Sequence, residues 1–136
     1  MRGFSMIVAA VVLAGGLAGP VMGQDVDCDN PQTQTEMTQC AQWDWAAADE
    51  ELNGVYSAAV AVMQDTDANL SAAERGAEEA LRAGQRAWVT FRDNACLAEA
   101  YAFTGGSMQP MVQMGCMARL TWARVGDLYI LTDQGN

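Results

Sequence analysis

The 136-residue sequence contains no histidine and no lysine. These residues are among the commonest general bases in enzymes, and histidine also activates the nucleophile in Ser-His and Cys-His pairs. Two carboxylates could still hydrolyse a glycoside, but nothing in the sequence places a particular pair across a cleft. We therefore predict a protein that is not an enzyme and has no catalytic residues.

Metal and cofactor motifs are also absent. The sequence has no C-x-x-C pair and no C-x-x-C-H haem site, and it has no histidine to help build a zinc site. Methionines at Met108, Met111, Met114 and Met117 have the soft sulfur that suits Cu(I). However, steps of three residues turn each side chain about 60° further around a helix, so the four cannot face one ion. Since methionine also fills gaps in cores, we expect no metal and no cofactor.

The longest uncharged apolar run lies at the N-terminus. Arg2 precedes Met6–Gly19, which carries no charge, and Pro20 ends the run. This pattern is typical of a secretory signal peptide, and the run is shorter than the ~20 residues that a membrane span needs. We predict that residues 1–23 are a cleaved signal peptide. Residues 24–136 would then form a single exported domain, periplasmic or secreted, with no membrane association.

Acidic residues dominate the charge of the chain. The formal net charge is −10, and loss of Arg2 with the signal peptide would make it −11. Such a surface repels nucleic acid and anionic lipid and favours a basic partner. An equally simple interpretation is that the acidity only keeps an exported protein soluble.

No segment alternates apolar and polar residues as a strand would, whereas the abundant Ala, Met, Leu, Gln and Glu favour helices. We predict an all-α fold, an antiparallel three-helix bundle with helices over residues 33–64, 71–102 and 107–131. The second helix would turn an apolar stripe toward the core. That stripe consists of Leu81, Trp88, Phe91, Ala95 and Ala98.

Capping signals set the predicted helix starts. "TQTE" from Thr33 and "SAAE" from Ser71 both fit the capping box, and Ser107 can cap the third helix. Between these helices, "QDTDAN" at 64–69 and "TGGS" at 104–107 have the composition of turns.

Four cysteines in an oxidising compartment predict two disulfides. Cys96 and Cys116 lie about ten residues on either side of the glycine pair, so both would sit ~15 Å from the turn in an antiparallel hairpin. A segment extended from Cys28 could fold back far enough to meet Cys40 in the first helix. We therefore predict the pairs Cys96–Cys116 and Cys28–Cys40.

Three charged residues fall on apolar helical stripes. Arg92 is spaced by four residues from Trp88 and from Cys96, and both Arg124 and Asp49 also lie on apolar stripes. A buried charge is tolerated only when it is paired. We predict that Asp49 pairs with Arg92, Arg124 or both inside the bundle, as a structural ion pair rather than a ligand site.

Five sequence blocks resemble, in order and spacing, the lysozyme inhibitor LprI-like N-terminal domain family. The blocks are "CDNPQTQTEMTQCA", "ADEELNGVY", "GQRAWVTFRDNAC", "GGS" and the final "C…LT..R…L". The resemblance covers nearly all of residues 24–136 and implies a small, exported, helical protein with cysteines. Because the family takes its name from a member that inhibits lysozyme, it also implies a binding protein with lysozyme as its partner. The alternative is a periplasmic structural or interaction module with another partner.

The turn "FTGGSMQ", Phe103–Gln109, is the candidate binding element. Its tip, Gly105, Gly106 and Ser107, could enter the substrate cleft of lysozyme between the catalytic carboxylates. The alternative is that the glycines serve only the geometry of the turn.

Overall fold

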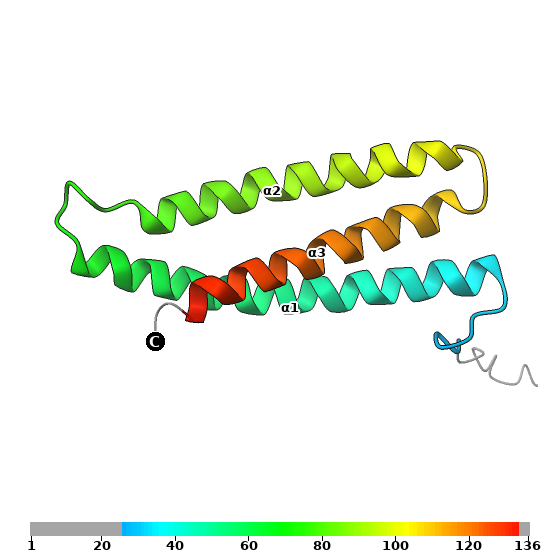
Figure 1. Ribbon diagram of the computed structural model, residues 1–136, viewed down its shortest axis with the longest axis horizontal. Coiled ribbons are helices and arrows are strands. Elements are labelled where there is room, and N and C mark those ends of the chain that lie inside the picture. Colours follow the sequence, from blue (N-terminus) through cyan, green and yellow to red (C-terminus); the bar gives the residue numbers. More distant parts are fainter. Residues whose placement is uncertain (1–25, 134–136) are drawn as a thin grey trace, which may run out of the picture.

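A computed structural model describes residues 26–133, so the predicted signal peptide lies outside the described residues. Three α-helices and one short 3-10 helix make up this part of the chain, which contains no strand: α1 (Gln34–Asn69), α2 (Ala77–Ala100), η1 (Tyr101–Phe103) and α3 (Gln109–Asp133). α1 and α3 run in the same direction, and α2 runs opposite to both (Figure 1). The predicted all-α three-helix bundle is confirmed. Within residues 26–133, none of the helices combines the length and the apolar composition that a membrane crossing requires.

The predicted start of α1 is correct. The Thr33 hydroxyl accepts a hydrogen bond from the Glu36 N–H at 3.2 Å, and the Glu36 carboxylate accepts one from the Thr33 N–H at 3.0 Å. These two bonds satisfy amides that the first helical turn leaves free, so α1 begins where its capping box lies.

The predicted connection between the first two helices is wrong at both ends. α1 continues through the expected turn at 64–69, and α2 begins at Ala77 rather than at residue 71. Ser71 and Glu74 form a separate turn, in which the Glu74 N–H donates to the Ser71 carbonyl at 2.9 Å. The cap of α2 comes instead from the Asp67 carboxylate, which accepts from the Gly76 and Ala77 N–H groups.

The third helix also begins later than predicted. α3 starts at Gln109, two residues after Ser107, so Ser107 is not its N-cap. The Gln109 N–H donates instead to the Gly106 carbonyl at 3.3 Å. Ser107 therefore belongs to the turn and remains exposed.

The core consists of two apolar clusters along the bundle. The larger cluster joins all three helices through Leu52, Val55, Ala59, Val60, Leu81, Val125 and Leu128. The smaller cluster surrounds a disulfide and contains Cys96, Cys116 and Met117, with Trp45 and Leu120 against it. Arg92 and Thr121, both buried, lie between the two clusters in the order of their helices.

One side of the predicted stripe on α2 faces solvent. Leu81 and Trp88 pack in the core as expected, but Phe91 is 60% exposed and Ala98 is exposed. The buried side of α2 is centred on Leu81, Gln85, Arg92, Cys96 and Ala100, and Phe91 and Ala98 lie ~100° or more away from that line around the helix.

Both predicted disulfides are present. Cys28–Cys40 holds the segment before α1 against that helix, with a Cα–Cα distance of 5.6 Å. Cys96–Cys116 joins α2 to α3, with a Cα–Cα distance of 5.4 Å. The predicted equal distance from the glycine turn explains the second pair.

Candidate functional site

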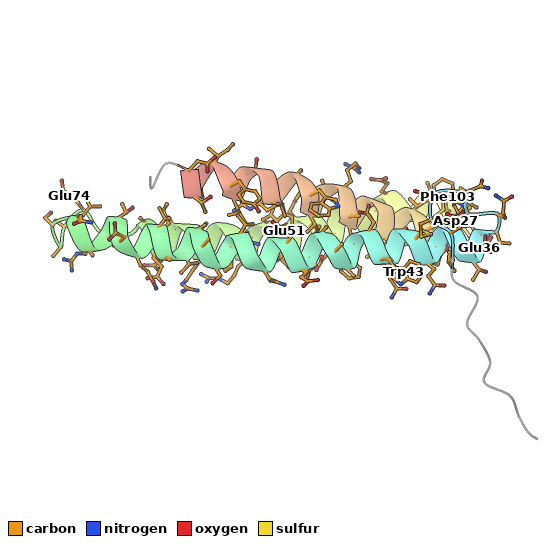
Figure 2. All side chains as sticks on the ribbon, turned by 90° about the horizontal axis from the view of Figure 1, so that it is seen from below. Asp27, Glu36, Trp43, Glu51, Glu74 and Phe103 are labelled. Carbon is orange, nitrogen blue, oxygen red and sulfur yellow. A yellow bond between two sulfur atoms is a disulfide. The ribbon has the colours of Figure 1, made fainter. Side chains whose placement is uncertain are left out.

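Two loops meet at one end of the bundle, which we call the turn end and define as residues 27–40 and 103–108. Asp27, Glu36 and Phe103 lie together at this end, and Glu74 lies at the other (Figure 2). The two parts lie side by side, because Ser107 and the first turns of α1 line one groove, and the Gln34 side-chain amide donates to the Met111 sulfur of α3 at 3.3 Å. The turn end therefore brings the predicted binding turn beside the first turns of α1.

Local hydrogen bonds fix the shape of the turn. Gly105 has a φ of 80°, which favours glycine, and its N–H donates to the Gln109 side chain at 3.3 Å. The Gly106 N–H donates to the Phe103 carbonyl at 3.0 Å. Phe103 and Met108 flank this tip and are 38% and 41% exposed. The glycines thus serve the turn itself, and the apolar side chains on either side are free to contact a partner.

A shallow groove, lined by side chains with polar end groups, runs from the turn along the start of α1. Its lining residues carry only amide and hydroxyl groups and are Gln34, Thr35, Thr38, Gln39, Gln42 and Ser107. Such groups both donate and accept hydrogen bonds. Of the three predicted contact residues, Ser107 is the one that takes part in this groove.

The negative charge is concentrated on one side of the molecule. Between residues 26 and 74 the chain has no basic residue. α1 alone contains seven acidic residues, Glu36, Asp44, Asp49, Glu50, Glu51, Asp65 and Asp67. The net charge by itself hides this asymmetry, although the spacing of the arginines along the sequence would have revealed it. A cationic partner would be drawn to α1 and to the turn end.

Of the predicted ion-pair residues, Asp49 belongs to this acidic surface of α1, whereas Arg92 lies in the core. Arg92 Nη1 is 3.4 Å from Asp49 Oδ1 and 3.3 Å from the Thr121 hydroxyl, while Arg92 Nη2 is 2.9 Å from Asp93 Oδ1. The Asp49 side chain remains 44% exposed, whereas that of Arg92 is 8% exposed. The Arg92–Asp49 ion pair therefore joins a buried guanidinium to a carboxylate at the surface, whereas the prediction placed both groups inside the bundle.

Arg124 has other partners. Its Nε donates to the Gln85 side chain at 3.1 Å, and its Nη1 is 3.9 Å from Asp127 Oδ2. The structure thus separates Arg124 from Asp49. Within residues 26–133, no group of three or more Cys, Asp or Glu side chains is arranged to hold a metal ion.

Comparisons with known proteins agree with this fold. The family model described as "Lysozyme inhibitor LprI" matches residues 28–128. An uncharacterized protein from Rhizobium meliloti (strain 1021) is 45% identical over 105 residues, which cover 75% of this chain and 76% of that protein. The crystal structure of a DUF1311 family protein from Pseudomonas putida KT2440 has a similar fold, with a TM-score of 0.64 and 24% identity over 75% of this chain and 96% of that one. Because the family model spans α1, α2 and most of α3, the chain belongs to the LprI lysozyme inhibitor family.

Proposed function

We propose that the protein is an exported, non-catalytic binding protein that inhibits lysozyme in the periplasm or outside the cell. The family match over residues 28–128 is the observation that carries this proposal. The charge on α1 supports it, since c-type lysozymes are basic proteins. Long-range attraction would speed their encounter, but it supplies little specificity.

Specific binding would come from the turn end. Phe103 and Met108 would serve as apolar contacts, and the narrow tip at Gly105 and Gly106 would enter the substrate cleft. Ser107, exposed beside the polar groove, can donate a hydrogen bond from its hydroxyl to a carboxylate in that cleft. In this arrangement the inhibitor blocks access of the cell-wall polymer and takes part in no chemical step.

A turbidity assay of cell-wall lysis tests the proposal. At about 150 mM salt the Debye length is ~8 Å, so a loose attraction between charged surfaces is largely screened. We expect excess protein still to slow lysis by c-type lysozyme at this salt concentration. Full lysozyme activity would contradict the proposal and would favour an interaction module with another partner.

Two variants with the same net charge separate a specific site from general attraction. Ser107→Arg places a positive charge and a large side chain in the turn, and Ala58→Arg places the same charge on an exposed position of α1 far from the turn. We expect Ser107→Arg to reduce inhibition about tenfold or more and Ala58→Arg to change it little. Equal loss in both variants would assign the effect to net charge alone.

A further inference from the structure

The outward face of α2 is mostly uncharged, with Glu79 near its start and Arg86 and Asp93 along one border. α2 lies along one edge of the bundle, on the side away from α1 (Figure 1). The exposed residues of this face are Ala80, Ala83, Gly84, Ala87, Thr90, Phe91, Asn94, Leu97 and Ala98, and Tyr101 continues the face directly after the helix. They recur every three or four residues, so they form one stripe along the helix. We call this stripe the α2 outer face.

The α2 outer face includes large apolar side chains in solvent. Phe91 is 60% exposed, Tyr101 is 62% exposed and Leu97 is 40% exposed. A long stripe that is mostly uncharged and exposes large apolar side chains, on a chain of net charge −10, indicates an interaction surface. We propose that a second copy of this chain covers it, with the two α2 helices packed antiparallel about a two-fold axis near Val89.

Side-chain size favours a second copy as the partner. The first half of the stripe is small, with Ala80, Gly84 and Ala87, and the second half holds the large residues. In an antiparallel pair centred near Val89, Phe91 of one copy lies level with Ala87 of the other. Leu97 and Tyr101 likewise fall on the small residues at the start of the partner helix. The face is therefore complementary to itself, as a two-fold interface requires.

Charge at the border of the stripe favours the same arrangement. The antiparallel pair places Arg86 of one copy near Asp93 of its partner. Asp93 contacts Arg92 through Oδ1, and in the described residues its Oδ2 has no hydrogen-bond partner. Arg86 likewise forms no ion pair within residues 26–133. A parallel pair would instead bring Phe91 level with Phe91 and would place Arg86 and Asp93 of the two copies on opposite edges of the contact.

The size of the stripe sets the strength of this contact. The 21 steps from Ala80 to Tyr101 span about 32 Å, and a helix is ~10–12 Å wide, so each copy buries on the order of 300–500 Å². This area is below the ~800 Å² per partner of a standard stable interface. The dimer is therefore reversible and depends on protein concentration. It does not rest on the proposed lysozyme inhibition, because the α2 outer face lies outside the turn end.

Sedimentation velocity over a concentration series tests the dimer, using protein with both disulfides intact. We expect the average sedimentation coefficient to rise with concentration. Phe91→Asp and Ala87→Glu each place a charge in the interface and should raise the dissociation constant about tenfold or more. Ala58→Glu, an exposed alanine-to-glutamate change on α1, is the matched control and should leave it unchanged.

Circular dichroism of each variant separates loss of association from loss of folding. A variant that keeps the helical signal and thermal midpoint of the parent but stays monomeric supports the proposal. A parent that remains monomeric at the highest concentration overturns it. Association that survives both Phe91→Asp and Ala87→Glu in folded protein also overturns it, since the copies would then meet elsewhere.

The direction of the two helices has its own test. Ala80 of one copy lies level with Ala98 of the other in the antiparallel pair, and the two Ala80 residues lie far apart. Under oxidation, a mixture of Ala80→Cys and Ala98→Cys proteins should therefore form a mixed disulfide-linked dimer in preference to either like pair. Preferential linkage of Ala80→Cys to itself would contradict the antiparallel arrangement.

Discussion

Arg92 is a charged side chain held between two aromatic rings in the interior of the bundle. Its guanidinium carbon lies 5.8 Å from the centre of the Trp45 ring and 5.1 Å from that of Trp88. Distances below about 6 Å permit cation–π attraction. Two partly exposed carboxylates, Asp49 and Asp93, complete its surroundings. The burial of Arg92 therefore depends on packing and on several weak polar contacts rather than on one enclosed ion pair.

This arrangement predicts that the two ends of the Arg92–Asp49 contact differ in importance. Arg92→Ala should lower the free energy of unfolding by about 2–4 kcal/mol, because it leaves a cavity between two tryptophans and removes the partner of Thr121. Asp49→Ala should lower it by about 1 kcal/mol or less, since the Asp49 carboxylate is partly exposed to water and lies 3.4 Å from Arg92. Urea denaturation of both variants measures the difference. Equal losses would show that the ion pair itself dominates.

Asp67 connects two helices that are consecutive in the chain. It lies in the last turn of α1, and its carboxylate accepts hydrogen bonds from the N–H groups of Gly76 and Ala77 at 2.9 Å each and of Glu78 at 3.1 Å. These amides are among those that the first turn of α2 leaves free. The hydrogen bond from Gly76, followed by those from Ala77 and Glu78, lowers the pKa of Asp67 below its ordinary value of 3.8. The side chain of one residue in the last turn of α1 thus caps α2.

The lowered pKa fixes the sign of a pH effect. A carboxylate whose pKa is lower in the folded state stabilises the fold above its unfolded pKa, and this stabilisation disappears as pH falls through the folded pKa. Asp67→Asn should therefore melt at a lower temperature than the parent above about pH 4. The difference in melting temperature between the parent and Asp67→Asn should become smaller as the pH is lowered further.

Thermal melts from neutral to acidic pH provide the measurement, with Asp65→Asn as the control. Asp65 lies two positions before Asp67 in the same helix. Within the described residues its carboxylate accepts only from the Asn69 side chain, so it caps no helix. A gap between parent and Asp67→Asn that stays constant down to the lowest pH would contradict the capping role.

The sequence correctly predicted those features of the fold that depend on residues close together in the chain. The Thr33 capping box, the glycine turn and the equal spacing of Cys96 and Cys116 each act over few residues or through helix geometry alone. The cap of α2 could not be found in this way, because Asp67 is nine to eleven residues from the amides that it binds. The predicted burial of Phe91 and Ala98 on α2 was wrong for another reason. Periodicity identifies an apolar face but not which of two adjacent faces is buried.

The candidate site was only partly predictable for the same reason. The glycines marked the position of the turn, and the turn lies at an exposed end as expected. The groove beside Ser107 could not be inferred, since it depends on how α1 packs next to the turn. The partners of Arg124 also depend on packing, because Gln85 reaches it from another helix.

The bundle as a whole depends on its covalent links, because its core is thin. Cys96 is fully buried and Cys116 is 3% exposed, and together they tie α2 to α3. Closing a loop with a sequence separation of 20 residues stabilises a fold by about 3 kcal/mol through restriction of the unfolded chain.

We therefore expect the double variant Cys96→Ala/Cys116→Ala to lose about 3 kcal/mol or more of unfolding free energy, since buried sulfur packing is lost as well. The Cys28–Cys40 disulfide closes a shorter loop at the edge of the bundle. The variant Cys28→Ala/Cys40→Ala should therefore lose somewhat less unfolding free energy. Urea denaturation compares the two directly, and a smaller loss at Cys96–Cys116 would contradict this ranking.

The order of the cysteines also bears on how the protein acquires its bonds. Cys28 pairs with the next cysteine in the chain, Cys40, and Cys96 pairs with the next, Cys116. A chain that emerges from its N-terminus presents the members of each pair together, so oxidation in order of appearance gives the native one of three possible connectivities. Interleaved bonds would require reshuffling through mixed disulfides, which takes seconds to hours. Formation of the two native bonds thus calls for an oxidant, and oxidation in order of appearance leaves no wrong pair for an isomerase to correct.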